Sequence, residues 1–411
     1  MDGGQTPKRT STSLGHPFPF GVNDVPPLSE SEALETARDV AKTVLAVHAS
    51  AVDREGRWPA DSLRALLDSG LGGLLAPKAV GGCGFGMAML ASICEILGQE
   101  CASSAICFGM HCVASAVIAS KATPEQSAFY LEPIARGTHL STLALSEPGT
   151  GSHFYLPEAQ LVQQGDSFVV TGVKSFVTNG GHADSYVIST TTPSRDDSGL
   201  GVFSCAVVPN AGPGISWKGD WDGLGMRGNS SIELRLDGVR LPRRALLGQP
   251  GDQTWYVFNV VAPFFLMAMA GTYLGVSSAA FEEARVHLAE REQSHTSRPL
   301  GSISVLQHRL GVLYGTLERT RQLVRLAGER GDRGEPDALP LLFSAKAEVA
   351  DCATTMTNEA LTILGGKGFA FGSRAHRLMR DARAAHVMSP TTDLLRTWAG
   401  RALLNLPILG A

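Results

Sequence analysis

Two short stretches of this 411-residue chain combine glycines with hydroxyl side chains in a way that suits the binding of a small molecule. In the first, Leu143-Ala-Leu-Ser-Glu-Pro-Gly-Thr-Gly-Ser152, the glycines Gly149 and Gly151 let the backbone approach a ligand closely and expose its N–H groups. Ser146 and Ser152 add hydroxyl donors. An ordinary turn can have the same composition, so this stretch alone leaves both interpretations open.

The second stretch is Gly172-Val-Lys-Ser-Phe-Val-Thr-Asn-Gly180. It sets an aromatic residue, a β-branched residue and a hydroxyl before an Asn-Gly pair, which is typical of a tight turn. The pattern predicts a strand edge that presents Thr178 to the ring of a cofactor.

The elements that position these stretches begin with helices. Ser29 and Glu32 form a capping-box signature at the start of a helix. Asp61–Leu75 and Met87–Ser120 have apolar patterns that predict further helices. The first 138 residues are therefore expected to be mostly helical.

The pattern changes near residue 140 to short runs typical of strands. Phe168–Val170 follows a Gly165-Asp166 turn signal. Ser185–Thr190 and Gly201–Val208 are also strand-like, and Ile232–Asp237 alternates apolar and charged residues as a half-buried strand does. This region predicts a small β domain.

From Asp252 onward the pattern is helical again. The predicted helices are Asp252–Glu292, Ile303–Glu329, Asp337–Leu364 and Thr391–Leu403, of which the last three are expected to form a bundle. Helices and strands are segregated and do not alternate as βαβ units would, so the fold class is α+β and no Rossmann sheet is expected. The predicted regions are a flexible N-terminal arm (1–27), an N-terminal helical domain (28–138), a central small β-barrel or β-sandwich domain (139–248) and a C-terminal helical bundle (249–411).

Composition excludes several classes of protein. The net charge of −4 lacks the basic excess of a nucleic-acid-binding surface. The seven cysteines are odd in number and include no C-x-x-C pair, which favours a reduced, cytoplasmic chain without disulfides or a metal site. The N-terminus lacks the apolar core of a signal peptide.

One segment is long and apolar enough to span a membrane. Thr254–Phe281 contains no charged residue. It does contain Asn259 and Pro263, and no cluster of lysines or arginines flanks it. Because a helix that is apolar on all sides can also be buried in a protein core or a subunit interface, we predict a buried helix and no membrane partner.

The two glycine-containing stretches resemble the paired signatures of the acyl-CoA dehydrogenase family, T-E-P-x-x-G-S-D and G-x-K-x-W-I-T-N-G. Gly225-Met-Arg-Gly-Asn-Ser and Asp237–Pro242 resemble the end of the family's β domain. Leu364–Phe369 with Arg380-Asp-Ala-Arg383 resembles its C-terminal signature. The resemblance implies a helical domain, a β domain and a four-helix bundle, with FAD between the β domain and the bundle and completed by a neighbouring subunit of a homodimer or homotetramer.

The resemblance also implies roles for individual residues. Ser146 and Thr178 would hydrogen-bond the flavin ring, Thr178 near N5, the atom that accepts hydride. Phe176 stands where the family usually has Trp and would cover one flavin face. Arg298 would contact the pyrophosphate, although the family's R-x-x-F-G motif is not preserved around it. The implied cofactor contacts in this and the partner subunit are Leu145, Ser146, Gly151, Ser152, Phe176, Val177, Thr178, Arg298, Gln307, Gly365, Gly366 and Thr391.

The carboxylate that takes a proton from the substrate in this family is missing from both of its usual places. Nine residues after Arg380, where most members have Glu, stands Ser389. The second place, in the long helix, aligns with Phe265. A serine hydroxyl is a poor base because its pKa lies far above that of a carboxyl group. His153 also replaces the Asp of the G-S-D signature.

Other groups could do proton work. His386 lies three residues before Ser389, His153 follows the glycine loop, and His111 lies in an apolar helix. A lone histidine is more often a structural residue, so each role stays a hypothesis. Asp393 is expected to cap a helix or lie on the surface.

We therefore keep three hypotheses. The first is an FAD enzyme with non-standard chemistry, either oxidative decarboxylation of a β-keto acid, which needs no base, or monooxygenation. Relatives in secondary metabolism are known for such departures, among them decarboxylating epoxyketone formation, N-hydroxylation, nitroalkane oxidation and desulfination. The second is a conventional dehydrogenase of acyl-CoA or of an acyl group on a carrier protein, with a relocated base. The third is a non-catalytic flavoprotein.

Overall fold

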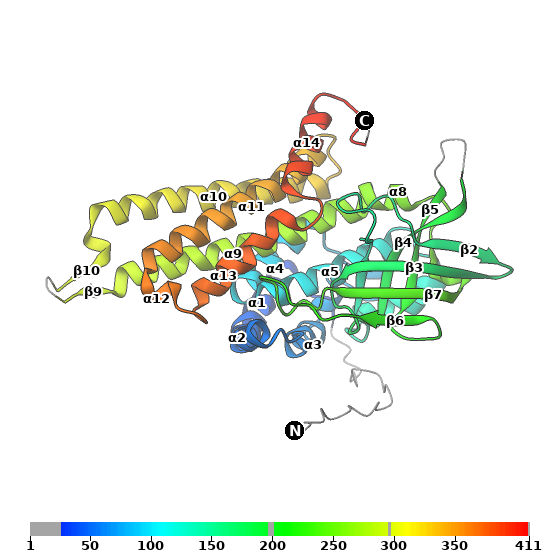
Figure 1. The fold of residues 1–411 in the computed structure, drawn as a ribbon, viewed down its shortest axis with the longest axis horizontal. Helices are drawn as coiled ribbons and strands as arrows, with labels where there is room; N and C mark the ends of the chain where they lie inside the picture. The colour runs from blue at the N-terminus through cyan, green and yellow to red at the C-terminus, as the bar shows by residue number, and fades with distance from the viewer. Residues whose placement is uncertain (1–25, 196–200, 295–296, 410–411) are drawn as a thin grey trace, which may run out of the picture.

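The computed structural model describes residues 26–195, 201–294 and 297–409, so nearly all of the predicted arm lies outside the described residues. Helices come first and last in the chain, and the sheet lies between them in sequence and at one end of the molecule in space (Figure 1). This arrangement confirms the predicted α+β class.

The N-terminal unit begins at the predicted capping box, in which the Ser29 backbone N–H donates to Glu32 Oε2 over 2.8 Å. The helix predicted over 61–75 is shorter than expected. It ends at Asp68, because Gly70 takes a left-handed conformation (φ 87°) and the chain continues as a 3₁₀ turn. The helices are α1 (Glu30–Val40), α2 (Ala46–Glu55), α3 (Ala60–Asp68), α4 (Met87–Glu100), α5 (Ala102–Ser120), α6 (Pro124–Gln126) and α7 (Glu132–Ala135), with π or 3₁₀ turns at Ala41–Leu45, Leu71–Gly73, Lys78–Val80 and Ser127–Leu131.

The central unit is an eight-stranded, mostly antiparallel sheet with the order β6-β7-β3-β2-β4-β5-β8, while β1 pairs with β4 in parallel. The predicted turn joins β2 to β3, where Gln164 pairs with Ser167 and Gly165 has φ 58°. The strands are β1 (Ser141–Ala144), β2 (Gln160–Gln164), β3 (Ser167–Val177), β4 (Ser185–Arg195), β5 (Gly201–Pro209), β6 (Ile215–Lys218), β7 (Ile232–Pro242) and β8 (Leu246–Leu247).

The C-terminal unit differs from the prediction in its choice of bundle helices. The segment Arg374–Val387 was not predicted as a bundle helix, yet it is α13 and packs against α9 and α11. The predicted last helix, α14, packs mainly across α11. The elements are α8 (Gln253–Tyr256), a π turn (Val257–Val261), α9 (Ala262–Glu290), β9 (Glu292–Gln293), β10 (Arg298–Pro299), a 3₁₀ turn (Leu300–Ser302), α10 (Ser304–Asp332), α11 (Ala338–Leu364), α12 (Gly366–Phe369), α13 (Arg374–Val387) and α14 (Thr392–Leu403).

Helix α9 joins the first and last units. At Gly271 a Cβ atom would lie 2.2 Å from the Ala91 carbonyl oxygen of α4, and at Gly275 one would lie 2.3 Å from the Glu95 carbonyl oxygen. Only glycine permits this backbone-to-backbone contact, which holds the two helices together along their length.

Two segments, Ala102–Ser120 and Gln253–Glu290, are long and apolar enough to cross a membrane. Within their most apolar windows, 94% and 78% of the residues are buried inside the protein, as expected for core helices. Their apolar surface is thus largely covered by the chain itself.

Candidate active site

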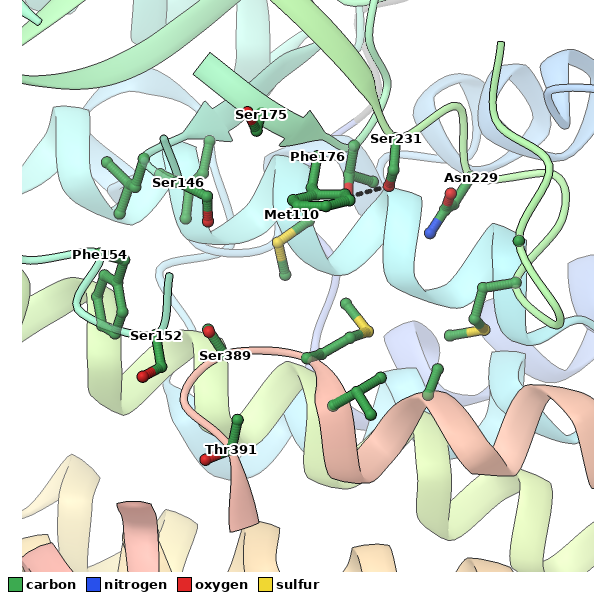
Figure 2. A pocket seen from close by; sticks show the side chains of 18 of the residues that line it. Met110, Ser146, Ser152, Phe154, Ser175, Phe176, Asn229, Ser231, Ser389 and Thr391 are labelled. Atoms are coloured by element: carbon green, nitrogen blue, oxygen red, sulfur yellow. Dashed lines mark hydrogen bonds between the residues drawn. The ribbon is translucent and has the colours of Figure 1, made fainter. Parts of the chain in front are cut away.

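A cavity of about 670 Å³ lies where the sheet meets α5, α9 and α13 (Figure 2). Most of the residues singled out from sequence line this one cavity, although they come from distant parts of the chain. They are Leu145, Ser146, Gly151, Ser152, Phe176, Thr178, Phe265, Ser389 and Thr391. Val177 is buried in the sheet beside them and does not line the cavity.

Hydroxyl groups mark the polar parts of the wall. Thr178 Oγ1 lies 3.4 Å from Ser231 Oγ (Figure 2, dashed line). On the opposite wall Thr391 is the N-cap of α14, and its Oγ1 accepts the backbone N–H of Leu394. The same wall carries Ser389, in the loop between α13 and α14.

Phe176 is turned into the cavity by an irregularity of its strand. The pairing of β3 with β7 shifts between Lys174 and Val177, and Phe176 there has φ 54°. Such a bulge redirects a side chain, and the left-handed conformation is strained for an aromatic residue. Phe176 is 69% exposed and its ring meets Trp221 edge-on at 6.4 Å between centroids, so it offers a bare aromatic face to a ligand.

Glu147 is the one carboxylate among the described residues that line the cavity, and no histidine lines it. Its side chain is fully buried in an ion pair with Lys174. It also accepts the backbone N–H groups of Glu158 and Ala159 over 2.5 and 3.2 Å. Burial lowers the pKa of Lys174, while the adjacent carboxylate of Glu147 raises it. Glu147 is therefore a structural anion with its oxygens occupied.

The loop that carries Ser389 is held from behind by a buried lysine. Lys346 Nζ, on α11, donates to the carbonyl oxygens of Met388 and Pro390 over 3.1 and 2.8 Å. Burial lowers the pKa of Lys346 to about 7. The Tyr273 hydroxyl donates to the Met388 sulfur at 2.9 Å.

The three histidines considered from sequence do not line the cavity. His386 lies on the side of α13 that faces α11, with Nε2 3.8 Å from Asp351 Oδ1 and Nδ1 3.2 Å from Thr392 Oγ1. His153 Nδ1 lies 2.6 Å from the Tyr155 hydroxyl. Asp393 is exposed in the first turn of α14 and does not cap it.

His111 has a structural role. Its Nε2 lies 2.9 Å from the Gly72 carbonyl oxygen, and its Nδ1 accepts the backbone N–H of Ser141 over 3.1 Å. Burial lowers the pKa of His111 to about 4, so the ring is neutral at physiological pH. It ties α5 to the start of the sheet.

The remaining predicted cofactor contacts lie away from this cavity. Arg298 is in β10 and Gly365 and Gly366 are at the start of α12, at the end of the bundle opposite the sheet (Figure 1). Gln307 is exposed near the start of α10 and donates to the Gly301 carbonyl oxygen over 2.8 Å. Within one chain they cannot contact a ligand in the cavity, and their predicted role at a partner's cofactor stays a prediction.

Several lining residues were not predicted. Asn229 lies within the Gly225-Met-Arg-Gly-Asn-Ser motif, which was noted only for its resemblance, and Ser231 follows it. Met110 lies in an apolar helix with no polar signal. Trp221 lies close to that motif in the sequence, and this proximity could have indicated it. Its Nε1 donates to the Met226 carbonyl oxygen over 2.8 Å, which orders the loop beside the cavity.

A largely apolar cavity with a bare aromatic face and several hydroxyl side chains in its wall is the kind of site that holds a flavin in an oxidoreductase. The chain matches "Acyl-CoA dehydrogenase, N-terminal domain" over residues 29–138, "middle domain" over 142–239 and "C-terminal domain" over 264–404. It is 30% identical to the cyclohex-1-ene-1-carbonyl-CoA dehydrogenase of Geobacter metallireducens over 373 residues, which are 90% of this chain and 97% of the relative.

Solved structures share the fold. The butyryl-CoA dehydrogenase of Megasphaera elsdenii superposes with a TM-score of 0.85 at 25% identity, covering 92% of this chain and 99% of that one. The FAD complex of PigA superposes with a TM-score of 0.83 at 20% identity, covering 92% and 98%. This chain belongs to the acyl-CoA dehydrogenase family.

The cofactor of the family, FAD, suits the residues present. Ser146, Ser152 and Thr391 would hold its polar edges, Thr178 would reach the flavin ring, and Phe176 would cover one face. Bound FAD supplies an acceptor for a hydride and, once reduced, can react with oxygen. The protein's own groups must orient the substrate and manage its protons and charges.

Proposed function

We propose that this chain is an FAD-dependent oxidoreductase that acts on a β-keto acid by oxidative decarboxylation, with dehydrogenation or monooxygenation following. The observation that carries the proposal is the absence of a free base among the described lining residues: Glu147 is neutralised by Lys174, and Ser389 and Phe265 stand where the family's carboxylates would be. Loss of carbon dioxide leaves an enolate without any proton transfer. Such a substrate makes its own carbanion, so the missing carboxylate is not needed.

The apolar wall supports this proposal. Met110, Met226, Met388 and Phe265 line the cavity, and an apolar environment favours the step in which the localised charge of a carboxylate becomes the delocalised charge of an enolate as neutral carbon dioxide leaves. Water excluded from the site also cannot quench the enolate before oxidation.

A second function is favoured by the relatives. Cyclohex-1-ene-1-carbonyl-CoA dehydrogenase and butyryl-CoA dehydrogenase are named for acyl-CoA substrates, and the first shares 30% of its residues with this chain. A conventional dehydrogenase of acyl-CoA, or of an acyl group on a carrier protein, would need a base from a residue outside the described lining or from a rearranged His386.

An anaerobic titration of the flavin-loaded protein distinguishes the two. Saturated acyl-CoAs and β-keto acids of matched chain length are added separately while flavin absorbance and released carbon dioxide are recorded. Bleaching by the β-keto acid alone, with release of carbon dioxide, is the expected result. Bleaching by a saturated acyl-CoA would mean that a base exists, and the conventional function would replace the proposal.

We further propose assembly as a homodimer or homotetramer, because Gln307, Gly365 and Gly366 are exposed far from their own chain's cavity. Light scattering after size-exclusion chromatography measures the mass directly. A monomer that retains stoichiometric FAD would contradict the proposed sharing of the cofactor between subunits.

A further inference from the structure

One polar side chain of the cavity has no role in the fold. Asn229 is 2% exposed and lines the cavity. Among the described residues, neither its Oδ1 nor its Nδ2 has a hydrogen-bond partner. Buried amides are almost always paired, because an unsatisfied buried polar group destabilises the folded state. The Nδ2 group, which Figure 2 shows on the cavity side of the amide, is therefore available to donate to a ligand in the cavity.

The backbone around Asn229 is rigid. Its N–H donates to the Met226 carbonyl oxygen over 3.2 Å, and its carbonyl oxygen accepts the N–H of Asn179 over 3.0 Å. Met226 N in turn donates to Asp381 Oδ1 over 2.7 Å, which fixes the loop to α13. The backbone that carries the amide is thus fixed before any ligand arrives, which limits where the side chain can reach.

Asn229 lies close in sequence to Ser231, which contacts Thr178, the residue expected to reach the flavin ring. Ser230 lies between Asn229 and Ser231, has φ 50° and directs its hydroxyl to the Gly180 carbonyl oxygen over 3.0 Å. The residues on either side of it therefore both line the cavity. Ser231 contacts Thr178, so Asn229 lies two residues along the chain from a contact of the residue expected near the flavin ring.

The surroundings make this amide selective. Figure 2 shows the Asn229 amide, with its nitrogen toward the cavity, across from sulfur-bearing and aliphatic side chains of α13 and its loop. Met110, Met226 and Met388 are apolar neighbours in the lining. Asn229 is one of several donors in the lining, together with Ser231, Arg380 and Arg383, and a donor among apolar neighbours favours a ligand that carries an acceptor there.

We infer that Asn229 donates its amide N–H to the β-carbonyl oxygen of the substrate, an inference that rests on the function proposed above. As the bond between the α-carbon and the carboxylate carbon breaks, its electron pair moves to the α-carbon and onto the β-carbonyl oxygen, and carbon dioxide leaves with no proton transferred. The oxygen becomes an enolate, and the Asn229 N–H stabilises its negative charge. Asn229 is then a catalytic residue. It also makes the site prefer a substrate with a keto group at the β-position to one with a methylene there.

The test uses the FAD-loaded protein and two ligands that cannot lose carbon dioxide: the methyl ester of a β-keto acid and the methyl ester of the saturated acid of equal chain length. Their Kd values are measured by perturbation of flavin absorbance. The wild-type protein should bind the keto ester about 10-fold more tightly, the effect of one hydrogen bond. Asn229→Leu, similar in volume, and Asn229→Ala should both lose this preference, whereas the exposed-site control Asn358→Leu should keep it.

A second measurement separates this inference from the function on which it rests. Release of carbon dioxide from the β-keto acid should fall roughly 10²- to 10³-fold in kcat for Asn229→Leu. If the wild-type protein releases none but shows a keto-ester preference that both variants lose, the decarboxylation is wrong and the donor assignment stands. If the wild-type protein lacks the preference, if the variants keep it, or if folded variants decarboxylate at the wild-type rate, the inference is overturned.

Discussion

The ion pair of Glu147 and Lys174 allows the proposed absence of a base to be tested by substitution. In Glu147→Gln the Lys174 ammonium loses its counter-ion while its side chain stays fully buried. Removing one partner of a buried pair costs about 3–5 kcal/mol. Because Lys174 still donates to the carbonyl oxygens of Leu145 and Ser189, we expect the lower end, about 3 kcal/mol. This corresponds to a fall in Tm of at most roughly 6–12 °C, because the Tm of a long chain shifts less per kcal/mol than the Tm of a domain of moderate size.

The assay is thermal and urea unfolding of the FAD-loaded variants, with Lys174→Met and the double variant completing a cycle. The double variant, which has no buried charge at this position, should recover most of the lost stability. A Glu147→Gln variant as stable as the wild type would refute the reasoning about the pair. A folded, flavin-loaded double variant whose turnover falls 10²- to 10⁴-fold would show that Glu147 is a general base, contrary to the proposed function.

The other predictions concern both walls of the cavity and its supports. Ser389→Glu, which restores the family's usual carboxylate, should not raise turnover of the native substrate, and a clear rise in an oxygen-consumption assay would contradict base-free chemistry. Because burial lowers the pKa of Lys346 from 10.5 to about 7, the unfolded chain holds a proton that the folded chain releases between these values. The free energy of unfolding should thus gain a contribution that grows from pH 7 to 10.5, and urea titrations of Lys346→Met should show a smaller rise. The pKa of His111 is lowered to about 4, so its contribution to stability is lost as pH falls from 6.5 to 4. His111→Gln should reduce that loss in acid unfolding curves, whereas His153→Gln at the exposed site should not. Thr391→Ala removes an N-cap and should lower the Tm by the equivalent of about 1 kcal/mol and weaken FAD retention, measured by flavin release on heating.

Local signals predicted much of the fold. The capping box at Ser29 and the Gly165-Asp166 turn depend on neighbouring residues alone, and both formed as expected. The end of α3 was misplaced because its leucines continue the apolar pattern beyond Gly70, where the backbone conformation changes. Helix α13 was missed since its charged residues weaken the apolar signal, and its contacts with α9 and α11 become visible only in three dimensions.

The site was predictable to the extent that motifs marked it. The stretches around Ser146 and Thr178 and the loop at Ser389 do meet in one cavity. Sequence could not show that Phe176 is turned by a bulge, or that the side chain of His386 faces α11 away from the cavity. It also could not show that Asn229 lacks a partner, because such a vacancy depends on every surrounding residue at once.

The glycine contact between α4 and α9 has a consequence for the order in which parts of the protein can fold during synthesis. The cavity wall that carries Ser389 emerges from the ribosome long after the wall that carries Ser146. Helix α4 must wait for Gly271 and Gly275 before its facing surface is covered. A nascent chain that stops before α13 therefore has half a cavity and an uncovered helix, so the cofactor should be acquired only after synthesis has passed residue 391.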